Sequence, residues 1–164
     1  MTIFLYFYLI SLSLIGYGFT ICKFLHIKEN CFGIYGILGF TFLAFISYFS
    51  TIFISHNLIF NSIIFFLGLL LFLYFSKKIK NFKKNFILLT IICIFSLFFI
   101  MVSKNHDDFP YYHFPYVSLL TEYSHPIGLG LINNGFRSPS SIFFISSMFF
   151  LPKSEIYLFH LTPA

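Results

Sequence analysis

Charged residues are scarce in this sequence, and carboxylates are the scarcest of them. Only 9% of the 164 residues are charged, and Asp and Glu together number five. A soluble domain typically carries about 25% charged residues. A chain that is 59% hydrophobic would precipitate unless lipid were its solvent. The composition therefore excludes an ordinary soluble domain and predicts a membrane protein.

Four long runs contain no charged residue, at positions 1–21, 32–54, 58–75 and 86–102. A helix of roughly 17–25 residues crosses a bilayer, and all four runs fall in that range. Backbone groups in lipid must be hydrogen-bonded within a helix or a closed barrel. None of the runs alternates polar and apolar residues as barrel strands do. We therefore predict an all-α, polytopic membrane protein, with four transmembrane helices in a region spanning 1–103.

The N-terminal half lacks the features of a cleaved signal peptide and of a cysteine metal site. The first Lys is Lys23, so the first run has no basic segment before it, and no small-residue cleavage site follows it. We interpret this run as a retained anchor and not a cleaved signal peptide. The three cysteines, Cys22, Cys31 and Cys93, lack the spacing of metal ligands. They are interpreted as apolar fillers.

The basic residues predict the orientation of the chain. Five lysines lie in the link at 77–85, Lys23 and Lys28 lie in the first link, and the link at 55–57 has none. Positively charged loops stay in the cytoplasm. We expect the first and third links (the third at 76–85) inside, the N-terminus outside, and residues 104–164 largely extracytoplasmic. A nucleic-acid or anionic-lipid patch is the alternative reading of the lysines.

The composition changes abruptly at Ser103. Beyond it lie four of the six histidines, all six prolines and four of the five acidic residues, namely Asp107, Asp108, Glu122 and Glu155. Charge is costly inside the bilayer, at about 2.5–3.5 kcal/mol per residue, so its absence from the spans is expected. Its concentration just after one span does not follow from that cost, and it marks residues 104–164 as a separate extracytoplasmic region.

Prolines and glycines predict the local structure of this region. Pro110 and Pro115 favour a compact loop followed by a helix, and Pro126 ends that helix near position 125. Its polar and apolar residues lie on opposite faces, which predicts an amphipathic helix in the headgroup plane. The polar face consists of Ser118, Thr121, Glu122 and His125, and the apolar face of Tyr116, Leu119, Leu120 and Tyr123. Glycine-rich turns follow. Ser138 as N-cap and Pro139 at N1 predict a re-entrant or juxtamembrane helix to about position 151, and a further membrane helix starts near the end.

This region resembles the first large extracytoplasmic loop of bacterial polytopic glycosyltransferases of the GT-C class. It is most similar to multispanning bacterial membrane proteins in which Tyr-His follows an Asp by four residues. Those proteins continue with an amphipathic helix, a Gly-Leu-Gly turn, and an Arg before a Ser-rich helix. The similarity covers roughly residues 104–160. The matching residues are Asp108, Tyr112, His113, Gly128, Leu129, Gly130, Arg137 and Ser138.

The resemblance implies transfer of a sugar from a polyprenyl-phosphate donor to an envelope acceptor, on the outer face of the bacterial cytoplasmic membrane. Asp108 would be the general base or a ligand of a divalent metal, assisted by Asp107 and His113. A carboxylate that is partly desolvated beside another one becomes a better base. Arg137 would hold phosphate. Substrate-binding residues would be Tyr112, Glu122, His125 and Arg137.

Each of these residues also has a plainer interpretation. The two aspartates suit a solvated turn, and His113 suits an interfacial aromatic position. Glu122 and His125 lie one helical turn apart, but two ligands without a third are weak evidence for metal, and a solvated face explains them. Arg137 suits a lipid headgroup contact.

Three functions remain open at this point. Proteins of the resembling class run to several hundred residues, so we expect this chain to be an N-terminal portion that needs the remaining polypeptide or a partner. A non-enzymatic accessory protein of the envelope is the second reading. An O-antigen polymerase or ligase is the third. Transport is disfavoured, because the four runs contain no ionisable Asp, Glu, Lys, Arg or His. We expect no nucleic-acid partner. Gly33, Gly36 and Gly39 predict close packing of the second span.

Overall fold

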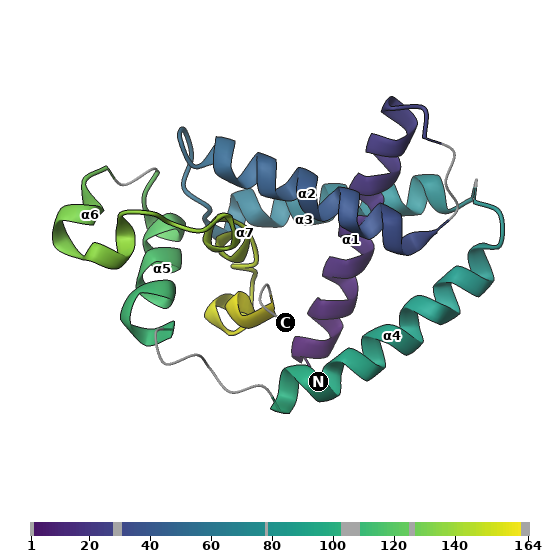
Figure 1. The fold of residues 1–164 in the computed structure, drawn as a ribbon. Helices are drawn as coiled ribbons and strands as arrows, with labels where there is room; N and C mark the ends of the chain where they lie inside the picture. The colour runs from purple at the N-terminus through teal and green to yellow at the C-terminus, as the bar shows by residue number, and fades with distance from the viewer. Residues whose placement is uncertain (1, 28–30, 78, 103–108, 125–126, 162–164) are drawn as a thin grey trace. The chain divides into compact units, whose positions relative to one another are not determined.

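The computed structural model describes residues 2–27, 31–77, 79–102, 109–124 and 127–161. All the regular elements among these residues are helical (Figure 1), and none is a strand. Four long helices come first: α1 Thr2–Phe24, α2 Phe32–Ser50, α3 Leu58–Ser76 and α4 Phe82–Val102. The predicted all-α class is confirmed for this part of the chain.

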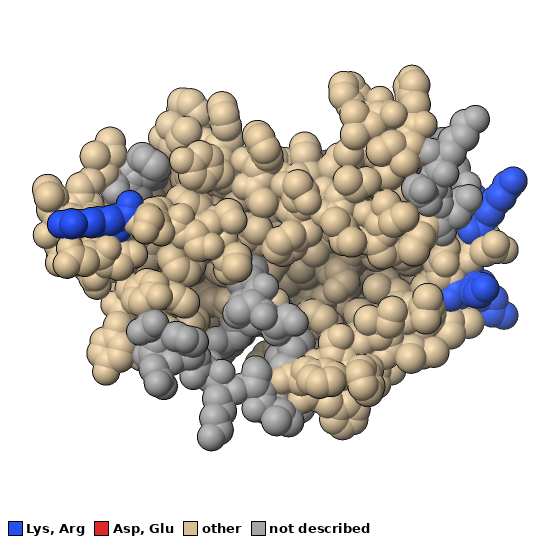
Figure 2. Space-filling view, in the orientation of Figure 1, with Lys and Arg blue, Asp and Glu red and all other residues tan. Residues whose placement is uncertain are grey.

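Three of these helices, α1, α2 and α3, are long and apolar enough to cross a membrane. The fourth, α4, has 21 residues and begins with two lysines in its first turn. The spans predicted from the sequence therefore coincide with helices, and at least three of them have the length and composition of membrane spans. Among the described residues, the face drawn in Figure 2 shows few basic side chains and no acidic one.

The described chain forms two compact units. The first unit comprises Met1–Leu43 and Ile63–Val102, and the second comprises Ala44–Ser62 and Ser103–Ala164. The end of α2, the α2–α3 turn and the start of α3 thus belong with the C-terminal region. The sequence suggested a division near position 103 without assigning this turn to the second region.

Helix α1 is the centre of the first unit. Its Gly16 lies so close to the backbone of α3 at Gly68 that a Cβ on either residue would collide. Its Gly18 lies equally close to the backbone of Tyr35 in α2. Tyr8 bonds the hydroxyl of Thr90 in α4 at 3.0 Å. Small residues allow this close approach of helix backbones within a bilayer.

An aromatic cluster gathers the ends of all four long helices in the first unit. Phe19 of α1 contacts Phe32 of α2, and Phe32 contacts Phe72 of α3 and Phe82 of α4, with ring centroids 5.8–6.1 Å apart. The Nζ of Lys23 lies 5.5 Å from the ring centroid of Phe75, a cation–π geometry. The two lysine-bearing links therefore lie at the same end of this unit.

The second unit contains the short helices. They are the π-helical turn η1 (Phe109–His113), α5 (Phe114–Glu122), α6 (Leu129–Ile132), the 3-10 turn η2 (Asn134–Phe136), α7 (Ser141–Met148) and η3 (Glu155–Leu161). Their core is a cluster of aromatic and aliphatic side chains from α5, α7 and η3: Tyr116, Val117, Leu120, Phe143, Phe144 and Phe159.

Two local predictions in this unit are wrong in detail. Helix α5 ends at Glu122, three residues before the expected end near 125, and Thr121 of its expected polar face is buried. Helix α5 packs against α7, and its buried residues include Thr121. The N-cap of α7 is Ser140, whose hydroxyl accepts from the amide of Ile142 at 3.3 Å. Pro139 therefore lies one residue before the N-cap and does not occupy the first turn of the helix.

Candidate functional site

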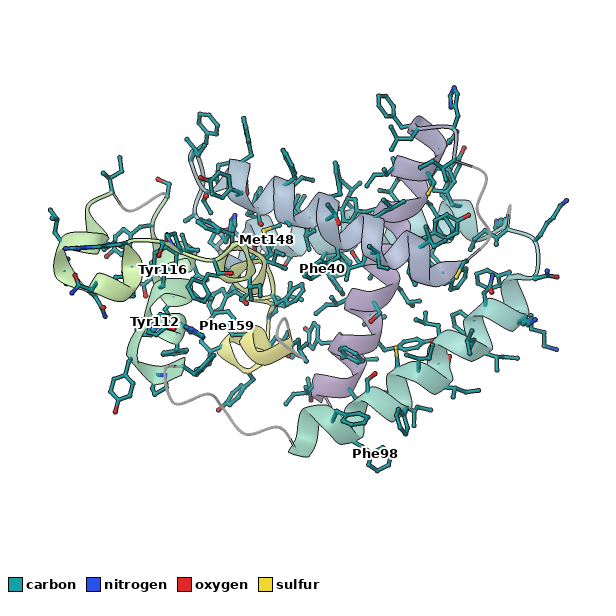
Figure 3. The ribbon with its side chains drawn as sticks, in the orientation of Figure 1. Phe40, Phe98, Tyr112, Tyr116, Met148 and Phe159 are labelled. Atoms are coloured by element: carbon teal, nitrogen blue, oxygen red, sulfur yellow. The ribbon has the colours of Figure 1, made fainter. Side chains whose placement is uncertain are left out.

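A cavity of about 280 Å³ lies in the second unit between η1, α5, α7 and η3. Tyr112 and His113 line one side of it, and Phe143 of α7 lines another. The ring centroid of His113 is 4.3 Å from that of Tyr112 and 4.8 Å from that of Phe143. In Figure 3 the side chains of Tyr112, Tyr116 and Phe159 gather in this part of the unit. The predicted pair Tyr112 and His113 thus borders one cavity.

Hydroxyl groups complete the lining of this cavity. Ser138 and Ser140 come from the segment that leads into α7, and Ser146 comes from α7 itself. A lining of aromatic rings with a few placed polar groups is typical of small-molecule sites, whose volumes start at about 300 Å³. At about 280 Å³ the cavity is just below that range, and its size suits one ring-sized group.

Arg137 lies at a second, more open depression of about 510 Å³, beside the Gly128–Gly130 turn. The Nε of Arg137 donates to the carbonyl oxygen of Gly130 at 3.3 Å, and the side chain is exposed. A Cβ on Gly130 would lie 2.9 Å from Cγ of Arg137, so glycine makes room for this side chain. Tyr116 lines the same depression, and burial raises the pKa of its phenol.

The turn segment is packed directly onto η1. A Cβ on Gly135 would lie 2.9 Å from Cγ of Tyr112. The amide of Asn133 donates to the carbonyl oxygen of Tyr111 at 3.4 Å. The fold therefore brings Tyr112 and His113 together with the segment that ends in Arg137.

The remaining predicted site residues are not part of this arrangement as described. Glu122 is exposed at the end of α5 and lines neither cavity. Asp107, Asp108 and His125 lie outside the described residues, so their roles stay predictions. Among the described residues no group of three His, Cys, Asp or Glu side chains could hold a metal ion.

Sequence reasoning missed a buried polar network in the second unit, centred on His56. This residue is 0% exposed. Its Nδ1 lies 2.5 Å from Oγ of Ser147 in α7, and its Nε2 lies 2.8 Å from Oγ of Ser50 in α2. Its backbone amide donates to the carbonyl oxygen of Leu120 in α5 at 2.9 Å. One residue thus ties the α2–α3 turn to two helices of the C-terminal region.

Asn61 extends this network from the first turn of α3. Its side-chain amide nitrogen lies 2.7 Å from the carbonyl oxygen of His56, 2.8 Å from that of Ser147 and 3.1 Å from that of Phe150. Asn61 is 1% exposed. Its carboxamide oxygen has no hydrogen-bond partner in the described structure, which fixes the amide orientation through its nitrogen alone.

The hydrogen bonds determine the tautomer of His56. The hydroxyl of Ser147 donates to the carbonyl oxygen of Phe144 at 2.8 Å, so its oxygen accepts from Nδ1–H. Burial lowers the pKa of His56 to about 4, and a hydrogen bond to the backbone of Ser47 opposes this shift. The neutral ring then accepts at Nε2 from the hydroxyl of Ser50 at 2.8 Å, a shorter distance than the 3.2 Å from this hydroxyl to the carbonyl oxygen of Ser47. Full burial separates this Ser–His pair from any substrate, so its role is structural.

The sequence held a weak signal for this network. Ser47, Ser50 and Thr51 recur at helical spacing at the end of the second run, and a histidine follows in a link of only three residues. Ser47 and Thr51 are 0% exposed. Hydroxyl residues are common in membrane helices, so the pattern alone did not distinguish this face from a lipid-facing one.

The comparison with known families covers nearly the whole chain. Residues 1–158 match the family described as a domain of unknown function, DUF8201. The chain belongs to this family. No curated protein and no solved structure matches the sequence significantly. The DUF8201 match includes both units, so the α2–α3 turn and the helices that it contacts are parts of one family domain.

Proposed function

We propose that this DUF8201 protein is the N-terminal, membrane-anchored portion of a bacterial glycosyltransferase. It would move a sugar from a polyprenyl-phosphate donor to an envelope acceptor at the extracytoplasmic face of the cytoplasmic membrane. In this proposal α4 is a fourth span, the N-terminus is outside, and the second unit faces outward. The observation that supports it most is the cavity bordered by Tyr112 and His113, four and five residues after Asp108.

The roles follow from the chemistry of the reaction. The acceptor oxygen forms a bond to the anomeric carbon while the bond from that carbon to the phosphate oxygen breaks. Asp108 takes the acceptor proton, directly or beside a divalent metal, and Asp107 raises its basicity by charge repulsion. His113 and Tyr112 hold the reacting ring in the aromatic cavity. Arg137 offsets the negative charge on the departing polyprenyl phosphate, and Glu122 and His125 contact substrate at the periphery.

A second candidate is a non-enzymatic accessory protein of the envelope. Three apolar side chains in and beside α6 are highly exposed: Ile127 at 89%, Leu131 at 90% and Ile132 at 81%. Exposed apolar patches commonly mark contacts with another protein or a membrane. This surface could be covered by another polypeptide without any reaction at the cavity.

The sugar-transfer proposal is tested in proteoliposomes that contain the full-length protein to which this sequence belongs. A panel of polyprenyl-phosphate sugars is supplied, and release of polyprenyl phosphate is measured. We expect turnover by the wild-type protein, and a loss of about 10²–10⁴-fold in Asp108→Asn, as for removal of a general base. The control is Lys153→Asn, because Lys153 is exposed and adopts φ 65°, which Asn tolerates.

The outcomes separate the two candidates. Full transfer by Asp108→Asn would remove this carboxylate from the mechanism. Absence of donor turnover by correctly inserted wild-type protein, with every sugar tried, would favour the accessory role.

A further inference from the structure

The first unit contains an apolar groove that the proposed function does not use. The groove has a volume of about 430 Å³ and is bordered by α1, α2 and α4. Its lining includes Ile15 of α1, Gly33, Gly36 and Phe40 of α2, and Leu89 and Ile92 of α4. Helices α1 and α2 have the length and composition of membrane spans. With α4 as the proposed fourth span, the groove opens to lipid.

The hydroxyl groups in the groove already have partners in their own helices. Ser11 donates to the carbonyl oxygen of Phe7 at 2.9 Å, and Thr41 donates to that of Ile37 at 2.9 Å. A hydroxyl bonded to its own helix backbone leaves little demand for an external polar partner. The groove therefore presents a surface suited to hydrocarbon.

The lining of the groove includes two glycines, Gly33 and Gly36, at which an added Cβ would not collide with the backbone of another helix. A Cβ on Gly33 would have its nearest contact with Sγ of Cys31, at 3.6 Å, and one on Gly36 with Cγ1 of Ile15, at 4.0 Å. A Cβ on Gly39 would collide with the carbonyl oxygen of Leu14. The expectation of close packing is thus confirmed for Gly39 alone, and Gly33 and Gly36 leave a trough.

The depth of the groove distinguishes between two kinds of occupant. Its lining extends from Cys31, just before α2, to Thr41 in α2, and ten helical steps rise about 15 Å. The hydrocarbon core of a bilayer is roughly 30 Å thick, so the groove has the depth of one leaflet. A transmembrane helix would need a groove across both leaflets, whereas one lipid chain needs only this depth.

The mouth of the groove lies at the lysine-rich end of the first unit. Asn85 lines the groove there, one turn before Leu88 and Leu89. Lys84 precedes Asn85 and lies one turn before Leu88 on the same face of α4. Lys77, Lys80, Lys83 and Lys84 are all exposed. An anionic headgroup at this depth would meet a cluster of cations.

We propose that the groove binds one acyl chain of an anionic phospholipid, whose phosphate lies beside Lys84. The site is independent of sugar transfer, because it uses no residue of the second unit. Depth, apolar lining and the cationic mouth together specify a phospholipid of the leaflet on the lysine side.

Native mass spectrometry of the full-length protein in detergent tests this proposal. Phosphatidylglycerol and phosphatidylcholine with identical chains are titrated separately, and bound lipids are counted. We expect one phosphatidylglycerol to remain bound, with at least tenfold preference over phosphatidylcholine. Gly36→Leu fills the trough and should lower occupancy at least fivefold. Leu70→Phe adds bulk at an exposed position of α3 outside the groove and should leave occupancy unchanged.

The lysines offer a matched pair for the headgroup. Lys84→Gln should reduce the preference for phosphatidylglycerol to less than threefold. Lys83→Gln removes the same charge but shares a helix face with Ile87, which does not line the groove, and should keep the preference within twofold of wild type. Equal effects of the two variants would overturn the assigned headgroup position.

The native Cys31 provides a measurement without any substitution. It is exposed and lines the groove, whereas Cys22 and Cys93 are buried. Phosphatidylglycerol should slow alkylation of Cys31 at least fivefold, and phosphatidylcholine should not. Unchanged alkylation, or unchanged lipid occupancy in a folded Gly36→Leu protein, would overturn the proposal. So would stronger retention of a polyprenyl phosphate than of phosphatidylglycerol.

Discussion

The imidazole of His56 and the hydroxyl of Ser147 are hydrogen-bonded at 2.5 Å although 91 residues separate them in the chain. The contact joins the α2–α3 turn to α7, and both partners are fully buried. A buried polar group that loses its partner costs about 1–3 kcal/mol. This pair therefore holds the second unit together more than its exposed polar residues do.

Removing the imidazole should weaken the second unit. We expect His56→Phe to lower the free energy of unfolding by about 1–3 kcal/mol, because Ser147 and Ser50 lose a buried partner. Thermal unfolding in detergent, followed by near-UV circular dichroism, measures the effect. His26→Asn is the control, since His26 is exposed with φ 57°. Equal midpoints for the two variants would contradict the prediction.

The depressed pKa of His56 makes stability depend on pH. The folded-state value of about 4 lies below the ordinary 6.5, so the unfolded chain binds the extra proton between these values. The contribution of His56 to the free energy of unfolding is fully present above pH 6.5 and is lost as pH falls toward 4. A shift of that size corresponds to about 3 kcal/mol. The measured difference in stability between wild type and His56→Gln should therefore shrink over this range; a pH-independent difference would argue against it.

The glycines of α2 should differ sharply in their tolerance of a methyl group. Gly39→Ala drives a Cβ into the backbone of α1, and such overpacking costs about 1–3 kcal/mol or more. Gly36→Ala meets only Ile15 at ordinary contact distance and gains helix propensity of roughly 1 kcal/mol. The two variants are compared by the fraction of each protein that stays folded after heating in detergent. Similar losses in both variants would show that the two glycines pack alike.

The proposed orientation predicts which thiols a reagent reaches in intact cells. Cys31 is exposed beside the first link and should react with a maleimide only when the membrane is permeabilised. A cysteine placed at Lys153, which is exposed in the second unit, should react in intact cells. The reverse result for the two cysteines would contradict the proposed orientation and indicate the opposite one.

The sequence by itself predicted a lipid environment for the chain and determined the class of its secondary structure. A chain with so few charges is expected to lie in lipid, and there the backbone is hydrogen-bonded within a helix or a closed barrel. The helices α1 to α4 accordingly follow the uncharged runs. The lysines of the links predict an orientation from charge alone, and that orientation stays a prediction.

Only the tertiary structure decided which polar and small residues face the interior. His56 contacts Ser147 although no local sequence pattern relates the two, and Thr121 is buried although its spacing places it on the expected polar face. Gly36 and Gly39 lie three residues apart in α2, yet only Gly39 lies against the backbone of α1. Local periodicity fixes the face of a helix, whereas the neighbour on that face is set by packing between segments distant in sequence.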